Sequence, residues 1–273
     1  MKYKRLIIIL SSIFAFVVLC TILSFTLFRA TNISFDFKNQ TTIFASTEKQ
    51  NEVIKSGKIN TGIPIFSLNK RQIVNNLESK NPYLKVINIE TQFPNKLILH
   101  CAEREELFCI KSRDDLYYYC DEDLKILNIS RTSNIMQDNA VYLEGVDILN
   151  TGATVGEILD FYKGEDIVSK ILNAFSYSNK NATDVKAILK NIELKYENNF
   201  YTCGIEPTLV FTTYDDFNIE IRNAKSFLKT KINLMLNIVP QKPEYYSTHK
   251  LVIDINPNKT DEVYCVLEKL YFY

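Results

Sequence analysis

A long uncharged stretch near the N-terminus limits what this chain can fold into. Residues 6 to 28 read LIIILSSIFAFVVLCTILSFTLF and contain no charged residue, no glycine and no proline. As a helix this stretch would rise about 34 Å, and the hydrocarbon core of a bilayer is about 30 Å thick. We therefore expect a transmembrane helix over residues 6–28, preceded by a cytoplasmic tail at residues 1–5.

The charges that flank this stretch predict its orientation. Lys2, Lys4 and Arg5 precede it, and Arg29 follows it closely. Basic residues favour the cytoplasmic side, so the N-terminus is expected inside the cell and the rest of the chain outside. A cleaved signal peptide is the alternative, but its apolar region is usually about 7–15 residues long and ends in a small-x-small site. This run is longer and ends in TLFR.

Composition excludes some classes of partner for the exterior region. Lys and Arg number 32, as do Asp and Glu, so the formal net charge is zero. Because phosphate binding needs an excess of basic residues, nucleic acid is not expected as the main partner. Apolar residues make up 46% of the chain and charged residues 23%, which is ordinary for a globular protein with a real core.

The cysteines predict neither a complete disulfide framework nor a metal site. Of six cysteines, one lies in the uncharged run, and an odd number beyond it cannot all pair. No C-x-x-C occurs and the histidines number two, so no zinc site is expected. Buried small hydrophobes are the main interpretation. A bridge within the first three remains open if adjacent strands align them. These exterior cysteines are Cys101, Cys109, Cys120, Cys203 and Cys265.

The segment after the membrane predicts one small α+β domain, over residues 30–105. Ser46 or Thr47 can cap the first helix and Asn69 the second, whose apolar face would include Ile73 and Leu77. An order of strand, helix, helix, strand, strand within this length suits such a domain. The expected strands are 33–37, 42–45, 86–91 and 97–101, and the expected helices are 47–56 and 70–79.

The stretch FPNKLILHCAERE, residues 93 to 105, predicts how this domain closes. Pro94 cannot continue the ladder of the preceding strand, so Phe93, Pro94 and Asn95 suit a hairpin turn. Leu97 and His100 should then point to opposite faces of the sheet. The charged residues from 103 to 105 would lie where the chain leaves the small domain.

Residues 106–273 predict a second, larger α+β domain with an open antiparallel sheet. Helical spacing runs from 154 to 175 with a break at Gly164, and again from 223 to 236. Strands are expected at 107–111, 116–120, 125–129, 188–196, 209–213, 217–221, 251–255 and 263–270.

No motif in the chain predicts catalysis. A glycosidase would need two convergent carboxylates, but the acidic runs 114–115, 121–123 and 215–216 lie between strand-like segments and are typical of turns. G-x-S-x-G, H-E-x-x-H, P-loop and G-x-G-x-x-G motifs are absent. His100 and Cys101 would face opposite sides of one strand and so could not form a dyad. We expect no catalytic residue, no cofactor and no small-molecule substrate.

Several motifs follow one another at a characteristic spacing, most densely from residue 57 to 127. They are Gly62-x-x-Ile65-Phe66-x-Leu68-Asn69, Pro82, Pro94-Asn95-x-Leu97 and Glu103-Arg104. In the order and spacing of these motifs the chain resembles the FtsQ/DivIB family of bacterial cell-division proteins. Three positions depart from the family pattern: Leu124 replaces the Gly of an Asp-x-x-Gly turn, the Pro is missing from a later motif that ends in Gly145, and Asn256 replaces the Arg after LVIDI.

The resemblance implies a POTRA domain of order β-α-α-β-β and a scaffold without enzymatic activity. Such a protein links early and late division proteins at the septum by holding small bitopic partners of the FtsB/FtsL type through an edge strand near the C-terminus. The alternative for that strand is a core strand covered by residues 270–273. The alternative for the protein is a membrane-anchored surface protein that binds a ligand or another cell. The implied partner-binding residues are Thr260, Glu262, Val263, Tyr264, Cys265 and Val266.

Overall fold

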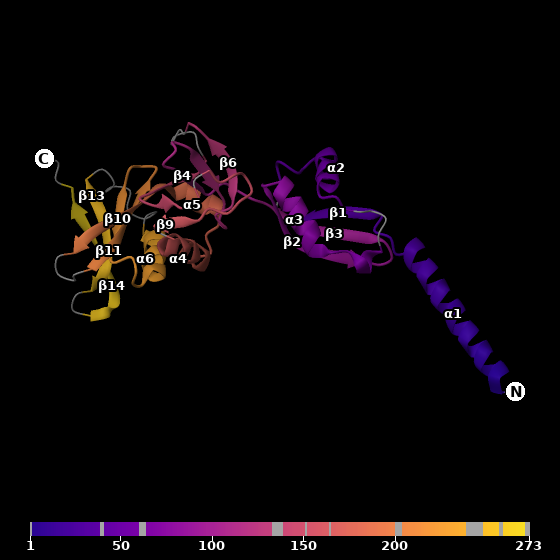
Figure 1. Cartoon of the computed structure of the whole chain (residues 1–273). Helices are drawn as coiled ribbons and strands as arrows, with labels where there is room; N and C mark the ends of the chain where they lie inside the picture. Colours follow the sequence, from indigo (N-terminus) through magenta and orange to yellow (C-terminus); the bar gives the residue numbers. More distant parts are fainter. Residues whose placement is uncertain are drawn as a thin grey trace. The chain divides into compact units, whose positions relative to one another are not determined.

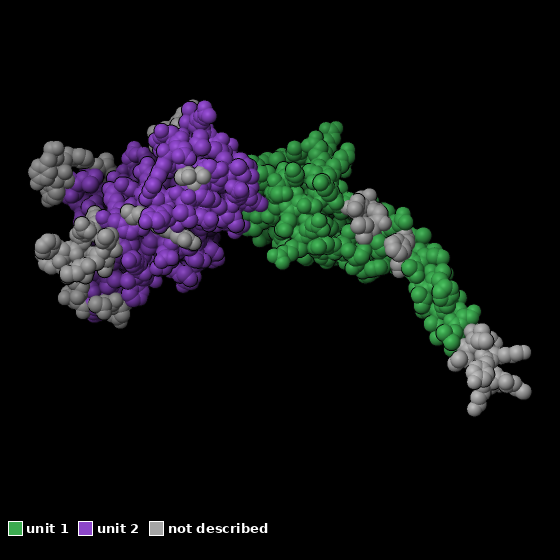
Figure 2. All heavy atoms as spheres, viewed as in Figure 1, with its two compact units in different colours: residues 1–104 green, residues 105–273 purple. Residues whose placement is uncertain are grey.

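The computed structural model divides the chain between Arg104 and Glu105 into two compact units, and most helices and strands of both are labelled in Figure 1. Figure 2 shows unit 1, residues 1–104, in green and unit 2, residues 105–273, in purple. The structure describes residues 2–38, 41–59, 64–132, 139–150, 152–163, 165–199, 204–238, 248–256 and 259–270.

The N-terminal segment forms the expected helix, α1 (Lys2–Thr26). Among the residues that the structure describes, no helix combines the length and the apolar character that a membrane crossing requires. After α1, the chain enters the folded part of unit 1 at β1 (Asn32–Phe37).

Beyond α1, unit 1 is a three-stranded sheet with two α-helices and has the predicted β-α-α-β-β order. The strand order is β1-β3-β2: β1 runs parallel to β3, and β2 pairs with β3 in an antiparallel hairpin. The elements after β1 are α2 (Thr47–Ser56), the short helix η1 (Ile65–Ser67), α3 (Lys70–Lys80), β2 (Leu84–Gln92) and β3 (Lys96–Glu103).

Local sequence signals account for the helices and the hairpin of unit 1. The side chain of Ser46 accepts a hydrogen bond from the Lys49 amide at the start of α2, and Asn69 does the same for Gln72 at the start of α3. Each bond satisfies an amide that the first helical turn leaves without a partner. The apolar faces of α3 and β3 meet in one core, which includes Ile73, Leu77, Leu97, Leu99 and Cys101.

The predicted strand at 42–45 is wrong. Instead, residues 42–44 form a turn. The carboxylate of Glu103 accepts hydrogen bonds from the amides of Thr42 at 2.8 Å and Ile43 at 3.1 Å. A side chain distant in sequence thus takes the place of a strand partner, which local alternation of apolar residues cannot reveal.

Unit 2 is built on a nine-stranded sheet of order β14-β13-β12-β11-β10-β7-β4-β5-β6. A separate two-stranded ribbon pairs β8 with β9. The strands are β4 (Phe108–Lys111), β5 (Tyr117–Cys120), β6 (Ile126–Ser130), β7 (Val141–Glu144), β8 (Asp147–Ile148), β9 (Phe161–Lys163), β10 (Leu189–Asn199), β11 (Gly204–Thr213), β12 (Asn218–Ile221), β13 (His249–Asn256) and β14 (Lys259–Lys269).

The prediction of an antiparallel sheet in unit 2 is wrong, because the sheet is mixed. β4 with β7, β7 with β10, and β12 with β13 are parallel pairs. Parallel neighbours need a crossover connection, and helices supply two of them: α4 (Glu165–Tyr177) and α5 (Ala182–Ile188) lie between β7 and β10, and α6 (Leu228–Ile238) lies between β12 and β13. Alternation of apolar residues predicts a strand but says nothing of its direction.

One apolar core joins the helices of unit 2 to one face of its sheet. Ile171 of α4 and Ile232 of α6 belong to the same buried cluster as Ile192 of β10 and Phe211 of β11. The predicted helix at 154–175 is wrong in its first half, because residues 155–157 lie in turns and β9 follows before α4 begins. Ile158 shows the reason: its side chain is 59% exposed, so its helical spacing marks no buried face.

Candidate partner-binding edge

The strand implied as the partner-binding site, β14, is the last strand at one side of the nine-stranded sheet. It is 11 residues long and pairs with β13 from His249↔Lys269 to Asn256↔Lys259. Within the part of the chain that the structure describes, no strand pairs with its outer side. Such a row of backbone donors and acceptors is a template for another strand. Residues 271–273, which could have covered it, lie outside the described residues.

The hydrogen-bond pattern shows which residues of β14 present their backbone outward. The amide of Leu270 donates to the carbonyl of Thr248 at 2.8 Å. In an antiparallel pair, opposite residues alternate between bonded and non-bonded positions. In this register, Tyr264 and Val266 therefore bond to β13, whereas Val263, Cys265 and Leu267 direct their amides and carbonyls away from it.

The side chains of β14 alternate between core and surface. Val263, Cys265 and Leu267 pack against the apolar core of unit 2. On the other face, Glu262 is exposed, Tyr264 is half-buried and Val266 is 43% exposed. The edge therefore combines an outward backbone with a mixed apolar and acidic surface. Thr260 lies within β14, but its side chain is outside the described residues.

Four charged side chains form a network on the outer face of β12, β13 and β14. Lys250 bonds to Glu220 at 2.5 Å and to Glu268 at 3.4 Å. Arg222 bonds to the same two carboxylates at 2.5 and 3.5 Å. Burial disfavours the charged form of Glu220, but Lys250 and Arg222 outweigh it and hold the pKa of this carboxyl below its ordinary value. The network ties the edge strand to its neighbours through side chains.

Sequence reasoning missed this network. Arg222 directly follows β12 and lies two residues after Glu220, and the period of two in a strand predicts that they share a face. That signal was present in the sequence. However, the pairing of β12 with β13, which brings Lys250 to them, depends on a crossover that the sequence pattern does not specify.

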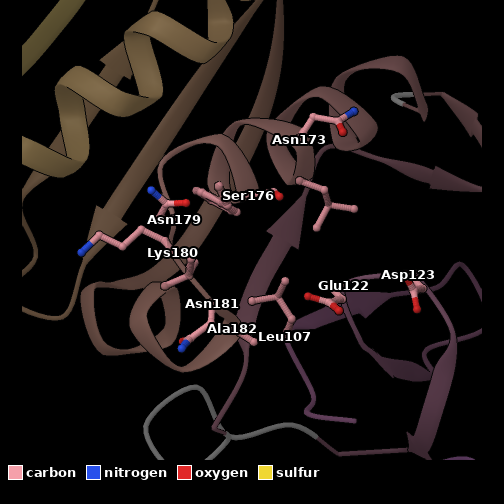
Figure 3. Close-up of a pocket in the computed structure, with 12 residues that line it drawn as sticks. Leu107, Glu122, Asp123, Asn173, Ser176, Asn179, Lys180, Asn181 and Ala182 are labelled. Atoms are coloured by element: carbon pink, nitrogen blue, oxygen red, sulfur yellow. The ribbon is translucent and has the colours of Figure 1, made fainter. Parts of the chain in front are cut away.

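A hollow of about 500 Å³ lies between α4, α5 and the turn after β5. In Figure 3, Glu122 and Asp123 lie on one side, and Asn179 and Lys180 from the α4–α5 connection lie across from them. Asp121 holds the turn, because its carboxylate accepts hydrogen bonds at 2.9 Å from the amides of Asp123 and Lys125. The prediction that the run 121–123 forms a turn is confirmed.

The other acidic runs are also turns. Asp115 has a φ of 57° and its carboxylate lies 2.8 Å from the amine of Lys111, which lowers the pKa of Asp115. Asp216 has a φ of 58° in the turn before β12 and forms an ion pair with Lys190. Asp115 and Asp216 serve their turns, whereas Glu122 and Asp123 line the hollow described above.

The cysteines and histidines are separated as the strand geometry requires. Cys101 lies in the core of unit 1, where burial raises the pKa of its thiol to about 12. His100 lies on the other face, 2.8 Å from Asp36 and 3.1 Å from Glu90.

Cys109 and Cys120 belong to clusters on opposite faces of the unit 2 sheet, so they are not bonded to each other. Cys203 lies outside the described residues. Across those residues, no group of metal-ligating side chains comes together.

Comparisons with known proteins decide the family. Residues 45–104 match the family model described as "POTRA domain, FtsQ-type". The cell division protein DivIB of Clostridium tetani is 30% identical over 188 residues, which cover 65% of this chain and 68% of that protein. The chain belongs to the FtsQ/DivIB family. Cell division protein DivIB of Clostridium botulinum (strain Loch Maree / Type A3) is 29% identical over 185 residues, 65% of this chain and 66% of that protein.

The family motifs have structural roles in this chain. Arg104, 9% exposed, pairs with Glu78 at 3.3 Å and closes unit 1. Glu105, the first residue of unit 2, pairs with Lys186 of the same unit at 3.3 Å. Leu124 replaces the family's glycine and adopts a φ of 61°, so the left-handed turn is kept without glycine. Gly62 lies outside the described residues.

Proposed function

We propose that this protein is a membrane-anchored scaffold of the bacterial division machinery, which binds small bitopic partners of the FtsB/FtsL type along β14. The relatives it matches are cell division proteins, and membership of their family supports a role in cell division. The observation that carries the finer proposal is the position of β14, whose outward backbone groups pair with no other strand among the described residues. A partner strand would satisfy these groups.

Membrane anchoring by α1 is part of this proposal. The charge-free sequence of residues 6–28 supports it. So does the exposure of Phe16, Val17, Val18 and Leu19, which ranges from 40% to 66%. Four consecutive residues cover every side of a helix, and a helix that is apolar all round belongs in a membrane or a core. With Lys2, Lys4 and Arg5 before it, we place the N-terminus in the cytoplasm and both units outside.

The partner-binding residues that we propose share one edge. A strand added to β14 would bond to the outward amides and carbonyls of Val263 and Cys265, and its side chains would contact Glu262, Tyr264 and Val266. Thr260 would extend the contact at the start of the strand. A small bitopic protein suits this mode because one extended segment is enough to form the interface.

The test is co-purification of tagged full-length protein with envelope proteins from dividing cells. We expect Tyr264→Lys to reduce partner recovery by roughly tenfold or more, because a half-buried aromatic side chain at the centre of an interface is replaced by a charge. Tyr214→Lys is the matched control, since Tyr214 is 42% exposed and lies in the turn before β12. Equal recovery from both variants would contradict the proposed edge.

Localisation tests the cellular role separately. A fluorescent fusion of the full chain should concentrate at the division septum. Diffuse signal over the membrane would instead favour an anchored surface protein that binds a ligand or another cell.

A further inference from the structure

Three segments of unit 1 meet where the chain would leave the membrane. The amide of Ile65 donates to the carbonyl of Phe28 at 2.8 Å. The amides of Thr31 and Asn32 donate to the carbonyl of Asn95, at 3.1 and 3.2 Å. The loop before α3 and the tip of the β2–β3 hairpin are therefore both fastened to the residues that follow α1.

Aromatic side chains from these segments form a cluster around Phe28. The ring centroid of Phe28 lies 5.9 Å from that of Phe66 and 5.8 Å from that of Phe93. The two partners are nevertheless largely open to solvent, Phe66 at 59% and Phe93 at 66%. Beyond the end of α1, the described residues of unit 1 expose five large hydrophobic side chains, and these are two of them. Exposed apolar side chains that gather in this way mark a contact surface.

We propose that Phe28, Phe66 and Phe93 form a membrane seat, which rests in the interfacial layer of the outer leaflet and holds the POTRA domain at a fixed depth. This proposal rests on the membrane anchor proposed above.

The aromatic cluster lies close to the end of the proposed anchor, and we therefore propose that lipid contacts it. Phe28 is the last residue of the uncharged run, so it enters the interface whichever way α1 is inclined. The polar layer on each side of a bilayer is about 5–8 Å thick, and the centroids of Phe66 and Phe93 lie within 5.9 Å of that of Phe28. These rings therefore lie at the depth of the headgroups and the upper acyl chains.

The charges beside the seat suit the same surface. Arg29 follows Phe28 directly and is exposed. Lys96 follows the hairpin tip and pairs in register with Asn32. Aromatic rings with flanking basic groups are the composition that binds membrane interfaces carrying anionic lipid.

The absence of tryptophan from the chain allows a direct test. Phe66→Trp, Phe93→Trp, Phe16→Trp and Ile87→Trp each give a full-length protein with one tryptophan. Each variant is reconstituted into vesicles of phosphatidylcholine and phosphatidylglycerol without bromine, with bromine on the upper acyl chains, and with bromine near the chain ends, where Phe16 would lie. Ile87 is the matched control because it is exposed on β2 of the same domain, at 54%, and lies about 20 Å along the strand from Phe93.

We expect brominated lipid to reduce emission from Phe66→Trp and Phe93→Trp by roughly twofold or more relative to Ile87→Trp. Phe16→Trp reports on the anchor alone. If Phe16→Trp is quenched while Phe66→Trp and Phe93→Trp behave like Ile87→Trp, the membrane seat is wrong and the anchor stands. If Phe16→Trp is not quenched either, the anchor is wrong and the seat fails with it.

A second measurement leaves the sequence unchanged. Wild-type protein is reconstituted with lipid that carries a photoreactive group near the headgroup, and cross-linked peptides are identified by mass spectrometry. We expect adducts on residues 64–68 and 93–96. Adducts confined to residues 6–28 would contradict the seat.

Discussion

The two edges of the nine-stranded sheet differ in length and in what covers them. β6 is five residues long, and its first residue is already paired: the amide of Ile126 donates to Glu157 and its carbonyl accepts from Gly156, both at 2.8 Å. β14 is 11 residues long, and no described segment pairs with its outer side. Proteins usually shorten or cover an exposed edge to prevent association. β6 follows that rule, whereas β14 departs from it, as a strand kept for a partner would.

The largest expected effect on stability comes from replacing a residue of β14 whose amide bonds to β13. Val266→Pro should lower the free energy of unfolding by about 2–4 kcal/mol, because the amide of Val266 bonds to β13 and would be lost. Cys265→Pro removes an outward amide and should cost only about 1 kcal/mol. Chemical denaturation of the two variants measures the difference.

The same two variants should differ in the opposite sense in partner binding. Cys265→Pro should keep its fold and still lose the partner in co-purification, because the proline ring occupies the outer side of the strand. A Cys265→Pro variant that retains the partner would remove the basis for strand addition, and Cys265→Ser controls for loss of the thiol.

The next largest expected effect on stability comes from the segment around Gly156, which pairs with the first residue of β6. Gly156 has a φ of 97°, which is unfavourable for any residue with a Cβ. We expect Gly156→Ala to destabilise unit 2 by about 1–2 kcal/mol and to speed amide exchange at Ile126. Unchanged exchange at Ile126 would mean that the segment around Gly156 does not cover this edge. Gly152→Ala is the control, because Gly152 also has a positive φ, of 83°, but its Cβ would lie in open space.

The charge network behind β14 predicts a smaller effect. Lys250→Met removes the cation between Glu220 and Glu268, and Glu220 is only 15% exposed. Arg222 still bonds to both carboxylates, so the expected loss of stability is about 1 kcal/mol. Thermal unfolding of Lys250→Met beside Lys195→Met provides the comparison, since Lys195 pairs with Glu193 alone in the described contacts. Equal stability of the two variants would show that the network adds nothing to the edge.

The smallest expected effect is a change of stability with pH in unit 1 that unit 2 does not share. The hydrogen bond from His100 to Glu90, with a further bond to Asp36, raises the pKa of this imidazole above 6.5. A raised folded-state pKa gives stability that is present below the unfolded pKa and is lost as pH rises through the folded value. Unit 1 should therefore lose a small amount of stability as pH rises from 6 to 8 (an approximate window set by the ordinary histidine pKa). His100→Gln should flatten the profile, and a wild-type profile already flat over this window would contradict the assignment.

The charge network beside β14 should not give unit 2 a similar change of stability with pH. The pKa of Glu220 is lowered and that of Lys250 is raised by their mutual contact, despite the opposing effect of burial on Lys250. Both groups therefore stay charged through neutral pH, and binding along β14 should be constant across the range in which unit 1 changes.

The sequence could predict the features that depend on neighbouring residues, but not those that depend on distant segments. Asn69 caps α3 and Pro94 lies in the hairpin turn, because these signals act within a few residues. The turn at Thr42 depends on Glu103, and the parallel pairing of β12 with β13 depends on where α6 returns the chain. Such features are set by contacts between distant segments, which apolar periodicity does not encode.

The candidate edge was predictable in part for the same reason. The alternation of Tyr264 and Cys265 across the two faces follows from period two. The outward direction of the Cys265 amide does not, because it depends on the register with Ile253.

Amide hydrogen exchange of β14 tests the central claim most directly. The outward amides of Val263, Cys265 and Leu267 should exchange fast in the free protein and become strongly protected when the co-purified partner is bound, while those of Tyr264 and Val266 are protected in both states. Partner binding that leaves the exchange of these three amides unchanged would contradict strand addition at this edge.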